Sequence, residues 1–458
     1  MQSIPCKDLY FPHERSIGTV FARQSQKSGG HTWRKIGLAQ GTLQVPTTGE
    51  YSLVIEAAPS ISPMLKLNLP DFLPPLAALK PGDLYHLDIR NLSNQFNDAH
   101  LKYLTHLTGL KSLDLAGTAF SGMNAEPLQA LTELESLNLS GTRVHSDSLR
   151  FLRSLPKLQS LYLRVTAIGN RGLLHVRALD QLRDLHLDHT RVTAAGLRHL
   201  TSLEALQDLS LAAIKIADTD ANNFRKLQHV RNLNINGTDI SGSALQSVFD
   251  MAKLETLLLT GTKVTDAAMD QVTKLRHLQR LGLAKTLVTD KTTEGLKRMS
   301  TLRAVHLRGT NITNKGARNL CALTGLEQLS LGGAHVTDAG FGEIGALRNL
   351  NSLYLDDTAI SDATLKHLCA SLRLELLSLS GTRITDAGLK YLEALTSMKT
   401  LSLENTRITS DGMNHLLRLR RLEYLNISNT NVGWDGVKLL ARLRRLTRLN
   451  WRGEIIDS

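Results

Sequence analysis

The stretch LELLSLSGTRITDAGLKYL, residues 374–392, contains the two patterns that decide the fold of this chain. Its first part alternates apolar and polar residues, and Leu377-Ser378-Leu379 is typical of a short strand whose leucines point to one side. Its last part places Leu389 and Leu392 three residues apart, on one face of a short helix. This stretch therefore predicts one strand followed by one helix.

The strand pattern recurs with a period of 24 residues and without a slip. Its first apolar residue lies at Leu110, Leu134, Leu158, Leu182, Leu206, Val230, Leu254, Leu278, Leu302, Leu326, Leu350, Leu374, Met398, Leu422 and Leu446. A further unit with Leu84, Leu87 and Ile89 precedes them by 26 residues, which makes about 16 units. Because one unit cannot bury its strand and helix leucines alone, the units are expected to stack. The repeat predicts an α/β solenoid with a curved parallel sheet on the concave side and short helices on the convex side.

Two polar positions recur with the same period. The ninth residue of the unit is Thr in twelve of the fourteen units from Thr118 to Thr430, the exceptions being Ile214 and Ala334. Its hydroxyl is expected to satisfy backbone groups where the chain leaves the sheet. Three residues later a Ser or Thr, such as Thr385, is expected to cap the helix. The Asp that often follows places negative charge in the first helical turn, where the helix dipole favours it.

The N-terminal part of the chain differs from the rest, because residues 1–83 lack the 24-residue register. Residues 42–45 and 51–55 have the composition of two strands, and the Pro/Gly segment 46–49 between them is typical of a turn. A small β cap would cover the leucine layer of the first repeat. We therefore expect a capping unit rich in β-hairpins at residues 1–83 and repeats at residues 84–458.

The motif Thr382-Arg383-Ile384-Thr385-Asp386-Ala387-Gly388-Leu389 resembles the 24-residue leucine-rich repeats of bacterial, planctomycete-like proteins, whose pattern is T-x-[VI]-T-D-x-G-L. The repeats are also similar to those of F-box substrate receptors, which commonly carry Cys or Asn where this chain has Thr. The resemblance covers residues 84–458 and implies a leucine-rich-repeat solenoid. Such repeats serve many different partners, so the resemblance does not fix a function.

Composition and motifs disfavour several classes of protein. No run approaches the roughly 18 apolar residues of a membrane-spanning helix, and residues 1–30 lack the pattern of a secretory signal. The cysteines, Cys6, Cys321 and Cys369, lack metal-ligand spacing and indicate a reducing compartment. The expected location is the cytoplasm, or outside the cell after export without a cleaved signal peptide. The sequence also lacks a nucleophile elbow, a phosphate-binding loop and a zinc-protease helix, so we expect neither an enzyme nor a cofactor.

The residues between the strand leucines are expected to form the concave surface, and three groups of them are candidates for partner binding. These groups are Tyr162, Arg164, Asp184, His186, Asp188 and Asp208, with His189 at the edge; Arg280, His306 and Arg308; and Tyr354, Asp356 and Asp357. Tyr and Arg are enriched at the energetic centres of protein interfaces. Two alternatives for the first group are an ordinary solvated sheet face and a metal site through His186 and the aspartates, although this spacing has no established ligand geometry.

More than half of the net charge of +12 lies near the C-terminal end. The basic residues there are Arg418, Arg420, Arg421, Lys438, Arg442, Arg444, Arg445, Arg448 and Arg452. They form either a solvated end of the solenoid or a patch for an acidic protein, nucleic acid or anionic membrane. Nucleic acid is disfavoured, because the concave groups carry both signs of charge and no aromatic residues alternate with the arginines.

These patterns predict a non-catalytic scaffold that binds a protein partner on the concave face of the repeats. Two alternatives remain open. The chain is an effector or adaptor that presents a bound protein to an enzyme machinery through its N-terminal unit, or it binds anions or nucleic acid through its basic C-terminal end.

Overall fold

The computed structural model describes residues 6–10, 18–25, 31–38, 42–46, 50–55, 73–216 and 218–457. The chain divides into two compact units, Met1–Lys215 and Ile216–Ser458. Both units contain repeats. The division at residues 83 and 84 that composition predicts falls within the first unit and stays a prediction.

The first unit contains β1 (Cys6–Tyr10), β2 (Gly18–Ser25), β3 (His31–Leu38), β4 (Thr42–Pro46), β5 (Tyr51–Ile55), β6 (His86–Asp88), β7 (Ser112–Asp114), β8 (Ser136–Asn138), β9 (Ser160–Tyr162), β10 (Asp184–His186), β11 (Asp208–Ser210) and the helix α1 (Leu173–Val176). Its 3-10 helices are Pro74–Ala78, Arg90–Gln95, Asp98–Tyr103, Glu126–Ala130, Ser146–Ser154 and Ala194–His199. Strands β6 to β11 pair in parallel, each with the next along the chain. The helical turns return the chain to each following strand.

The N-terminal strands pair differently from the prediction. Residues 42–45 and 51–55 do form strands, but β4 is antiparallel to β1, while β5 is antiparallel to β2 and parallel to β6. The expectation that they form one hairpin is therefore wrong, and residues 47–49 of its turn lie outside the described residues. Leu53 of β5 is fully buried opposite Leu87 of β6, so β5 extends the leucine layer of the repeats by one strand.

The second unit contains β12 (Asn232–Asn234), β13 (Thr256–Leu258), β14 (Arg280–Gly282), β15 (Ala304–His306), β16 (Gln328–Ser330), β17 (Ser352–Tyr354), β18 (Leu376–Ser378), β19 (Thr400–Ser402), β20 (Tyr424–Asn426), β21 (Arg448–Trp451) and β22 (Glu454–Asp457). Its helices are α2 (Gly242–Phe249), α3 (Asp266–Met269), α4 (Asp290–Leu296), α5 (Asn314–Cys321), α6 (Asp362–Leu368), α7 (Asp386–Leu389), α8 (Met413–Leu416) and α9 (Trp434–Leu440). Its 3-10 helices are Asp218–Lys226, Val272–Lys274, Asp338–Gly340, Ile344–Ala346, Lys390–Ala394 and Ser410–Gly412.

Strands β12 to β21 pair in parallel in the register that the 24-residue period predicts, with Leu257 opposite Leu281 and Leu353 opposite Leu377. The last strand, β22, is antiparallel to β21 and was not predicted. Arg452 and Gly453 between them have φ values of 54° and 81°. Positive φ at both central residues is the geometry of a tight hairpin turn, so the C-terminal residues fold back onto the last repeat.

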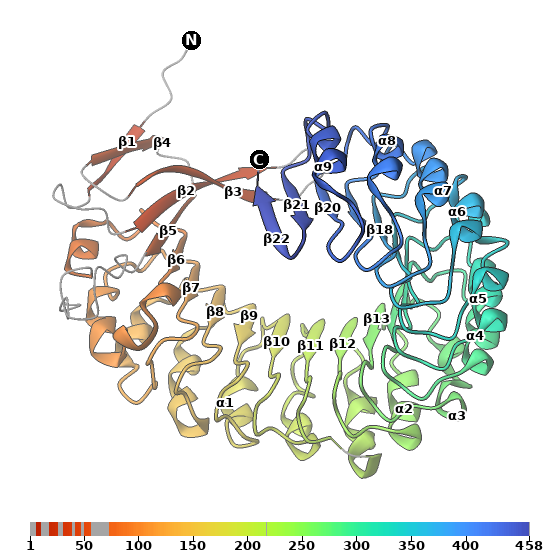
Figure 1. The fold of residues 1–458 in the computed structure, drawn as a ribbon. Helices are drawn as coiled ribbons and strands as arrows, with labels where there is room; N and C mark the ends of the chain where they lie inside the picture. Colours follow the sequence, from red (N-terminus) through yellow and green to blue (C-terminus); the bar gives the residue numbers. More distant parts are fainter. Residues whose placement is uncertain are drawn as a thin grey trace. The chain divides into compact units, whose positions relative to one another are not determined.

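The core of each unit lies between the strands and the helices. Within each unit the strands line the inner side of the coils and the helical segments lie on the outer side (Figure 1). The strand residues Leu377 and Leu379 and the helix-side residues Leu389 and Leu392 are all fully buried. This arrangement confirms the predicted leucine-rich-repeat architecture.

The recurring Thr closes each strand by a side-chain hydrogen bond, as predicted. In all twelve units that carry it, from Thr118 to Thr430, its hydroxyl donates to the carbonyl oxygen three residues earlier. At the two exceptions, Ile214 and Ala334, an apolar side chain is buried at the same place. The hydroxyl thus gives a buried backbone acceptor the partner it needs.

The eighth residue of the unit adopts a left-handed backbone conformation in every repeat from Gly117 to Gly453. Glycine is the usual residue there because it has no Cβ to oppose positive φ. The exceptions are Val165, His189, Ala213, Lys285, Asp357, Asn405 and Asn429, with φ values between 54° and 57°. Val165 is the only β-branched residue among them, and this conformation is a genuine outlier for such a side chain.

Candidate functional site

Tyr162 and His186 form the centre of the first candidate group. They end the neighbouring strands β9 and β10 and lie opposite each other in the sheet register. Their rings stack, with centroids 4.7 Å apart and an interplanar angle of 19°. Each side chain is partly exposed on the strand face, so the pair presents a flat, half-buried aromatic surface.

Arg164 binds both the ring of His186 and the carboxylate of Asp188. Its Nε lies 2.7 Å from Asp188 Oδ2, and its Nη2 donates to His186 Nδ1 at 2.5 Å. Asp188 also accepts the backbone N–H of Ala212 at 2.8 Å and the hydroxyl of Ser210. The guanidinium is therefore held in place, although 46% of the Arg164 side chain is exposed.

The surroundings fix the protonation of this cluster. Burial, and then the charge of Arg164, lower the pKa of His186, although Asp188 and Asp184 oppose the shift. A guanidinium can only donate, so Nδ1 of the neutral ring accepts and the ring proton lies on Nε2. Burial, and then the charge of Asp184, raise the pKa of Tyr162, so its phenol keeps its proton. The cluster thus combines neutral rings with one exposed cation.

Val165 follows Arg164, and His189 follows Asp188. The side chains of Val165 and His189 are exposed, and the backbone of each residue adopts the left-handed conformation. Val165 is 62% exposed. Holding such a residue in this conformation costs on the order of 1–3 kcal/mol, and conformations of this kind gather at functional sites. Val165 was not among the predicted site residues, although the sequence shows it as a departure from glycine at this position of the repeat.

The two remaining aspartates of the group, Asp184 and Asp208, begin β10 and β11. Asp184 is opposite Asp208 in the register of β10 and β11, and opposite Ser160 on its other side. The hydroxyl of Ser160 donates to Asp184 Oδ2 at 2.5 Å. Asp188, by contrast, is only 7% exposed and bonds to the next repeat. These contacts allow Asp188 to position Arg164, and its predicted role as a partner-contact residue stays a prediction.

The second and third candidate groups are joined by Arg308. Its guanidinium lies 3.4 Å from Asp356 Oδ2 and 3.0 Å from Asp357 Oδ2, two repeats further along the chain. It crosses the repeat between them above Gly332, where a Cβ would lie 2.8 Å from Arg308 Nη1. Gly332 therefore leaves the space for this ion pair, which sequence reasoning did not anticipate.

The other residues of these groups are spread along the strand face. Arg280 is exposed at the start of β14, and His306 ends β15. Burial, and then the charge of Arg280, lower the pKa of His306. Burial, and then Asp356, raise the pKa of Tyr354. Asp356 is only 8% exposed, because it accepts hydrogen bonds from Ser378 and Ser380 of the next repeat.

Two features are absent from the described part of the chain. Among those residues, no group of three or more His, Cys, Asp or Glu side chains is arranged to hold a metal ion, so His186 and its aspartates do not form such a cluster. No helix in the same residues has the length and apolar character to cross a membrane.

Comparisons with known proteins agree with the repeat architecture. A family model described as Leucine Rich repeat matches residues 298–321 and 374–392. A leucine-rich-repeat protein of Leptospira interrogans has a similar structure, with a TM-score of 0.53 and 19% identity over 80% of this chain and 95% of that one. An internalin of Listeria monocytogenes gives a TM-score of 0.46 and 18% identity over 77% of this chain and 88% of that one. No curated protein matches the sequence. The fold of this chain is that of a leucine-rich-repeat solenoid.

Proposed function

We propose that this chain is a non-catalytic scaffold that binds a protein partner on the inner, concave face of its repeats, centred on the Tyr162 patch. We define the Tyr162 patch as Tyr162, Arg164, Val165, His186 and His189. The observation that carries the proposal is an exposed valine in a left-handed conformation beside a prearranged Tyr–His–Arg cluster. Nothing in the packing of the repeat needs Val165, since glycine occupies the same position in eight other repeats.

The chemistry of the patch suits a protein surface. It offers two stacked rings, an apolar side chain and one exposed guanidinium that its neighbours already orient. Aromatic and Arg side chains that are held rigid lose little entropy on binding, which is why they dominate protein interfaces. Asp184 and Asp208 add negative charge at one side of the patch. We expect a partner with an apolar or aromatic side chain flanked by charges of both signs.

Four predicted site residues of the second unit are proposed as secondary contacts with the protein partner. Arg280, His306, Arg308 and Tyr354 lie on the strand face of β14 to β17 and the turns that follow. Arg308 is already paired with Asp356 and Asp357, so its charge is partly neutralised within the chain. Surface ion pairs of this kind contribute only about 0–1 kcal/mol, so a partner could exchange them at little cost.

Affinity capture from the source cells, quantified for wild-type chain and variants, tests this proposal. We expect Tyr162→Ala and Val165→Gly each to reduce capture of the partner about tenfold. Val165→Gly should also raise the free energy of unfolding by about 1 kcal/mol, since it removes backbone strain. Loss of binding together with a gain of stability cannot result from misfolding.

Lys285→Gly is the matched control, because Lys285 occupies the same left-handed position in another repeat with a φ of 54°. It should raise stability without changing capture. If Tyr354→Ala alone abolished capture, the contact would lie on the second unit. Equal capture by every variant would exclude the strand face as the binding site.

Three expectations from the sequence remain proposals. They are the cytoplasmic location, the adaptor or effector role, and the likeness to planctomycete-type and F-box repeats.

A further inference from the structure

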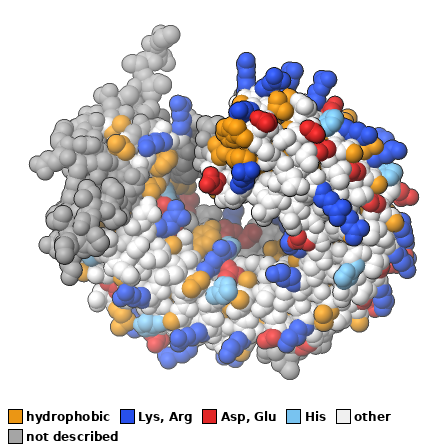
Figure 2. All heavy atoms as spheres, viewed as in Figure 1, with side chains coloured by type: hydrophobic (Ala, Val, Ile, Leu, Met, Phe, Trp, Pro, Cys, Tyr) orange, Lys and Arg blue, Asp and Glu red, His pale blue; other side chains and the backbone are white. Residues whose placement is uncertain are grey.

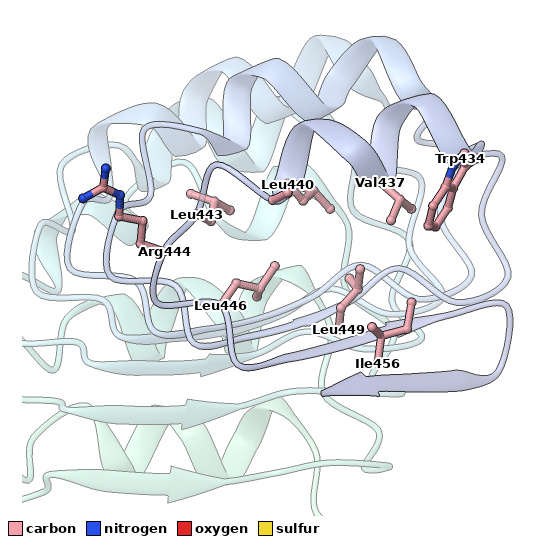
Figure 3. Close-up of a pocket in the computed structure, with 9 residues that line it drawn as sticks. Trp434, Val437, Leu440, Leu443, Arg444, Leu446, Leu449 and Ile456 are labelled. Atoms are coloured by element: carbon pink, nitrogen blue, oxygen red, sulfur yellow. The ribbon is translucent and has the colours of Figure 1, made fainter. Parts of the chain in front are cut away.

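An apolar groove lies at the C-terminal end of the second unit. It has a volume of about 390 Å³ and is floored by leucines of the last repeat, among them Leu440, Leu443 and Leu449. Trp434 of α9 and Ile456 of β22 border one end, and Arg444 lies at the other end (Figure 3). Trp434 is 54% exposed and Ile456 is 39% exposed. Elsewhere in this unit the following repeat covers the equivalent leucines, whereas here Trp434 and Ile456 border them.

A basic hollow adjoins the groove. Its volume is about 560 Å³, and it shares Leu443 and Arg444 with the apolar groove. Arg420, Arg442 and Arg445 complete its charged lining, and all four arginines are exposed. Hydrophobic side chains gather beside Lys and Arg at this end of the unit (Figure 2). Apolar and cationic surfaces are therefore continuous with each other.

Among the described residues, the four arginines of the basic hollow lie on adjacent loops without an acidic side chain at ion-pair distance, unlike several other arginines of this unit. Arg231, Arg303 and Arg308 each lie at ion-pair distance from a carboxylate. Among the described residues, none of the four arginines of the basic hollow has a carboxylate at such a distance. Four cations on adjacent loops repel one another, and an anionic ligand would relieve that repulsion.

We propose that the groove and the basic hollow together form a docking site for an acidic, amphipathic segment of a protein. An apolar side chain of the segment enters the groove beside Trp434, and carboxylates beside it contact Arg442, Arg444 and Arg445. Charge complementarity identifies the acidic character, and the leucine floor identifies the apolar anchor. This site is separate from the Tyr162 patch and does not depend on the proposed function.

Two other occupants fit less well. A bilayer surface is met by a row of protruding side chains. Trp434 and Ile456 are exposed at this groove, but the apolar floor beside them is a recess lined by buried leucines. Single-stranded nucleic acid needs aromatic side chains within a basic groove for base stacking. The lining of the basic hollow contains only Arg and Leu, and Trp434 lies in the apolar groove instead.

The test uses the full chain and a fluorescein-labelled helical peptide of glutamates with leucines at every third and fourth position. Fluorescence anisotropy should show binding that weakens about tenfold in the double variant Arg442→Glu, Arg444→Glu and also in Trp434→Ala. The matched control is Lys274→Glu, Arg276→Glu, which changes the same two positions of an earlier repeat. Lys274 and Arg276 are likewise exposed, and no acidic side chain of the described residues pairs with them. This control should change the dissociation constant less than about twofold.

Several results would overturn the proposal. No binding by the wild-type chain would do so, as would equal weakening by the control variant. Equal affinity for a peptide with serines in place of leucines would show that charge alone attracts the peptide and that the groove is not used. Stronger binding to phosphatidylserine vesicles than to the peptide, lost in Trp434→Ala, would assign the surface to a membrane instead.

Discussion

At Gly388 a single added methyl group would overlap a carboxylate of the preceding repeat. A Cβ built there lies 2.8 Å from Asp362 Cγ and closer still to Oδ1. The carboxylate is fixed, since it accepts the backbone N–H of Thr385 at 2.9 Å and its hydroxyl at 2.6 Å. Gly412 has the same relation to Asp386. The glycine of the repeat motif is thus explained by space for an aspartate one repeat earlier.

Two repeats show a different solution at the same position. Thr292 and Thr364 replace the glycine, and their hydroxyls donate to Asp266 and Asp338, each at 2.6 Å. Both threonines are buried. A hydroxyl at this position can hydrogen-bond the carboxylate, whereas the methyl group of an alanine, as at Ala244 opposite Asp218, cannot.

We predict that Gly388→Ala lowers the free energy of unfolding by about 1–3 kcal/mol, because it overpacks the junction between two repeats. Gly388→Thr should cost less, because the new hydroxyl can donate to Asp362 as Thr364 donates to Asp338. This order is opposite to intrinsic helix propensity, in which Ala is far better than Thr. Urea denaturation of both variants measures it. A more stable Ala variant would refute the packing argument.

At the scale of the element, the Asp that follows several of the helix caps joins neighbouring helical turns. The cap hydroxyls were predicted to accept from their own helix, and Thr289, Thr313, Ser361 and Thr409 do so. Thr385 makes no such bond and only donates to Asp362 of the preceding repeat. The interpretation of every Ser or Thr as a simple cap was therefore incomplete. The Asp contributes bonds between repeats as well as charge near a helix dipole.

These bonds predict how acid destabilises the second unit. Burial alone would raise the pKa of Asp266, but hydrogen bonds from the hydroxyl and backbone N–H of Thr289 and of Thr292 outweigh it and lower the pKa. A carboxyl whose pKa is lower in the folded state stabilises that state above its unfolded-state pKa. This stability is lost as the pH falls through the folded-state value, below about pH 4.

We predict that Asp266→Asn reduces the loss of stability on acidification. The variant should change the free energy of unfolding at pH 7 by less than about 1 kcal/mol. Asn can replace the contact, since Asn314 Oδ1 accepts the backbone N–H of Thr337 at 2.8 Å and its Nδ2 donates to the hydroxyl at 2.9 Å. Thermal unfolding at pH values from 3 to 7 measures the slope. If the variant lost stability with falling pH as steeply as the wild-type chain, Asp266 would not contribute to the acid sensitivity.

At the scale of the whole molecule, stability depends on where a repeat lies in its stack. Leu281 is fully buried, with Leu257 and Val305 opposite it on the two neighbouring strands. Leu449 in the last repeat is 6% exposed and lies between Leu425 and Ile456. A repeat in the middle of a stack supports both neighbours, whereas a terminal one supports a single neighbour.

We predict that Leu281→Ala costs about 2–5 kcal/mol and lowers the stability of the whole second unit. Leu449→Ala should cost less and should increase amide hydrogen exchange chiefly in β20 to β22. Hydrogen exchange followed by mass spectrometry separates the two patterns. Uniform acceleration across the unit in both variants would indicate all-or-none folding, without nearest-neighbour coupling.

The sequence by itself determined the repeat architecture, because each repeat contains the local strand and helix patterns and these patterns recur along the chain with a strict 24-residue period. It also located Tyr162, Arg164 and His186 on one surface, since strand alternation and register follow from the period. The tertiary structure alone decided which charges pair, because Arg308 reaches Asp356 only across Gly332. It likewise decided the strain at Val165, the pairing of β5 with β6 and the open groove beneath Trp434. These features depend on side chains and strands from different repeats meeting in space, which no single repeat encodes.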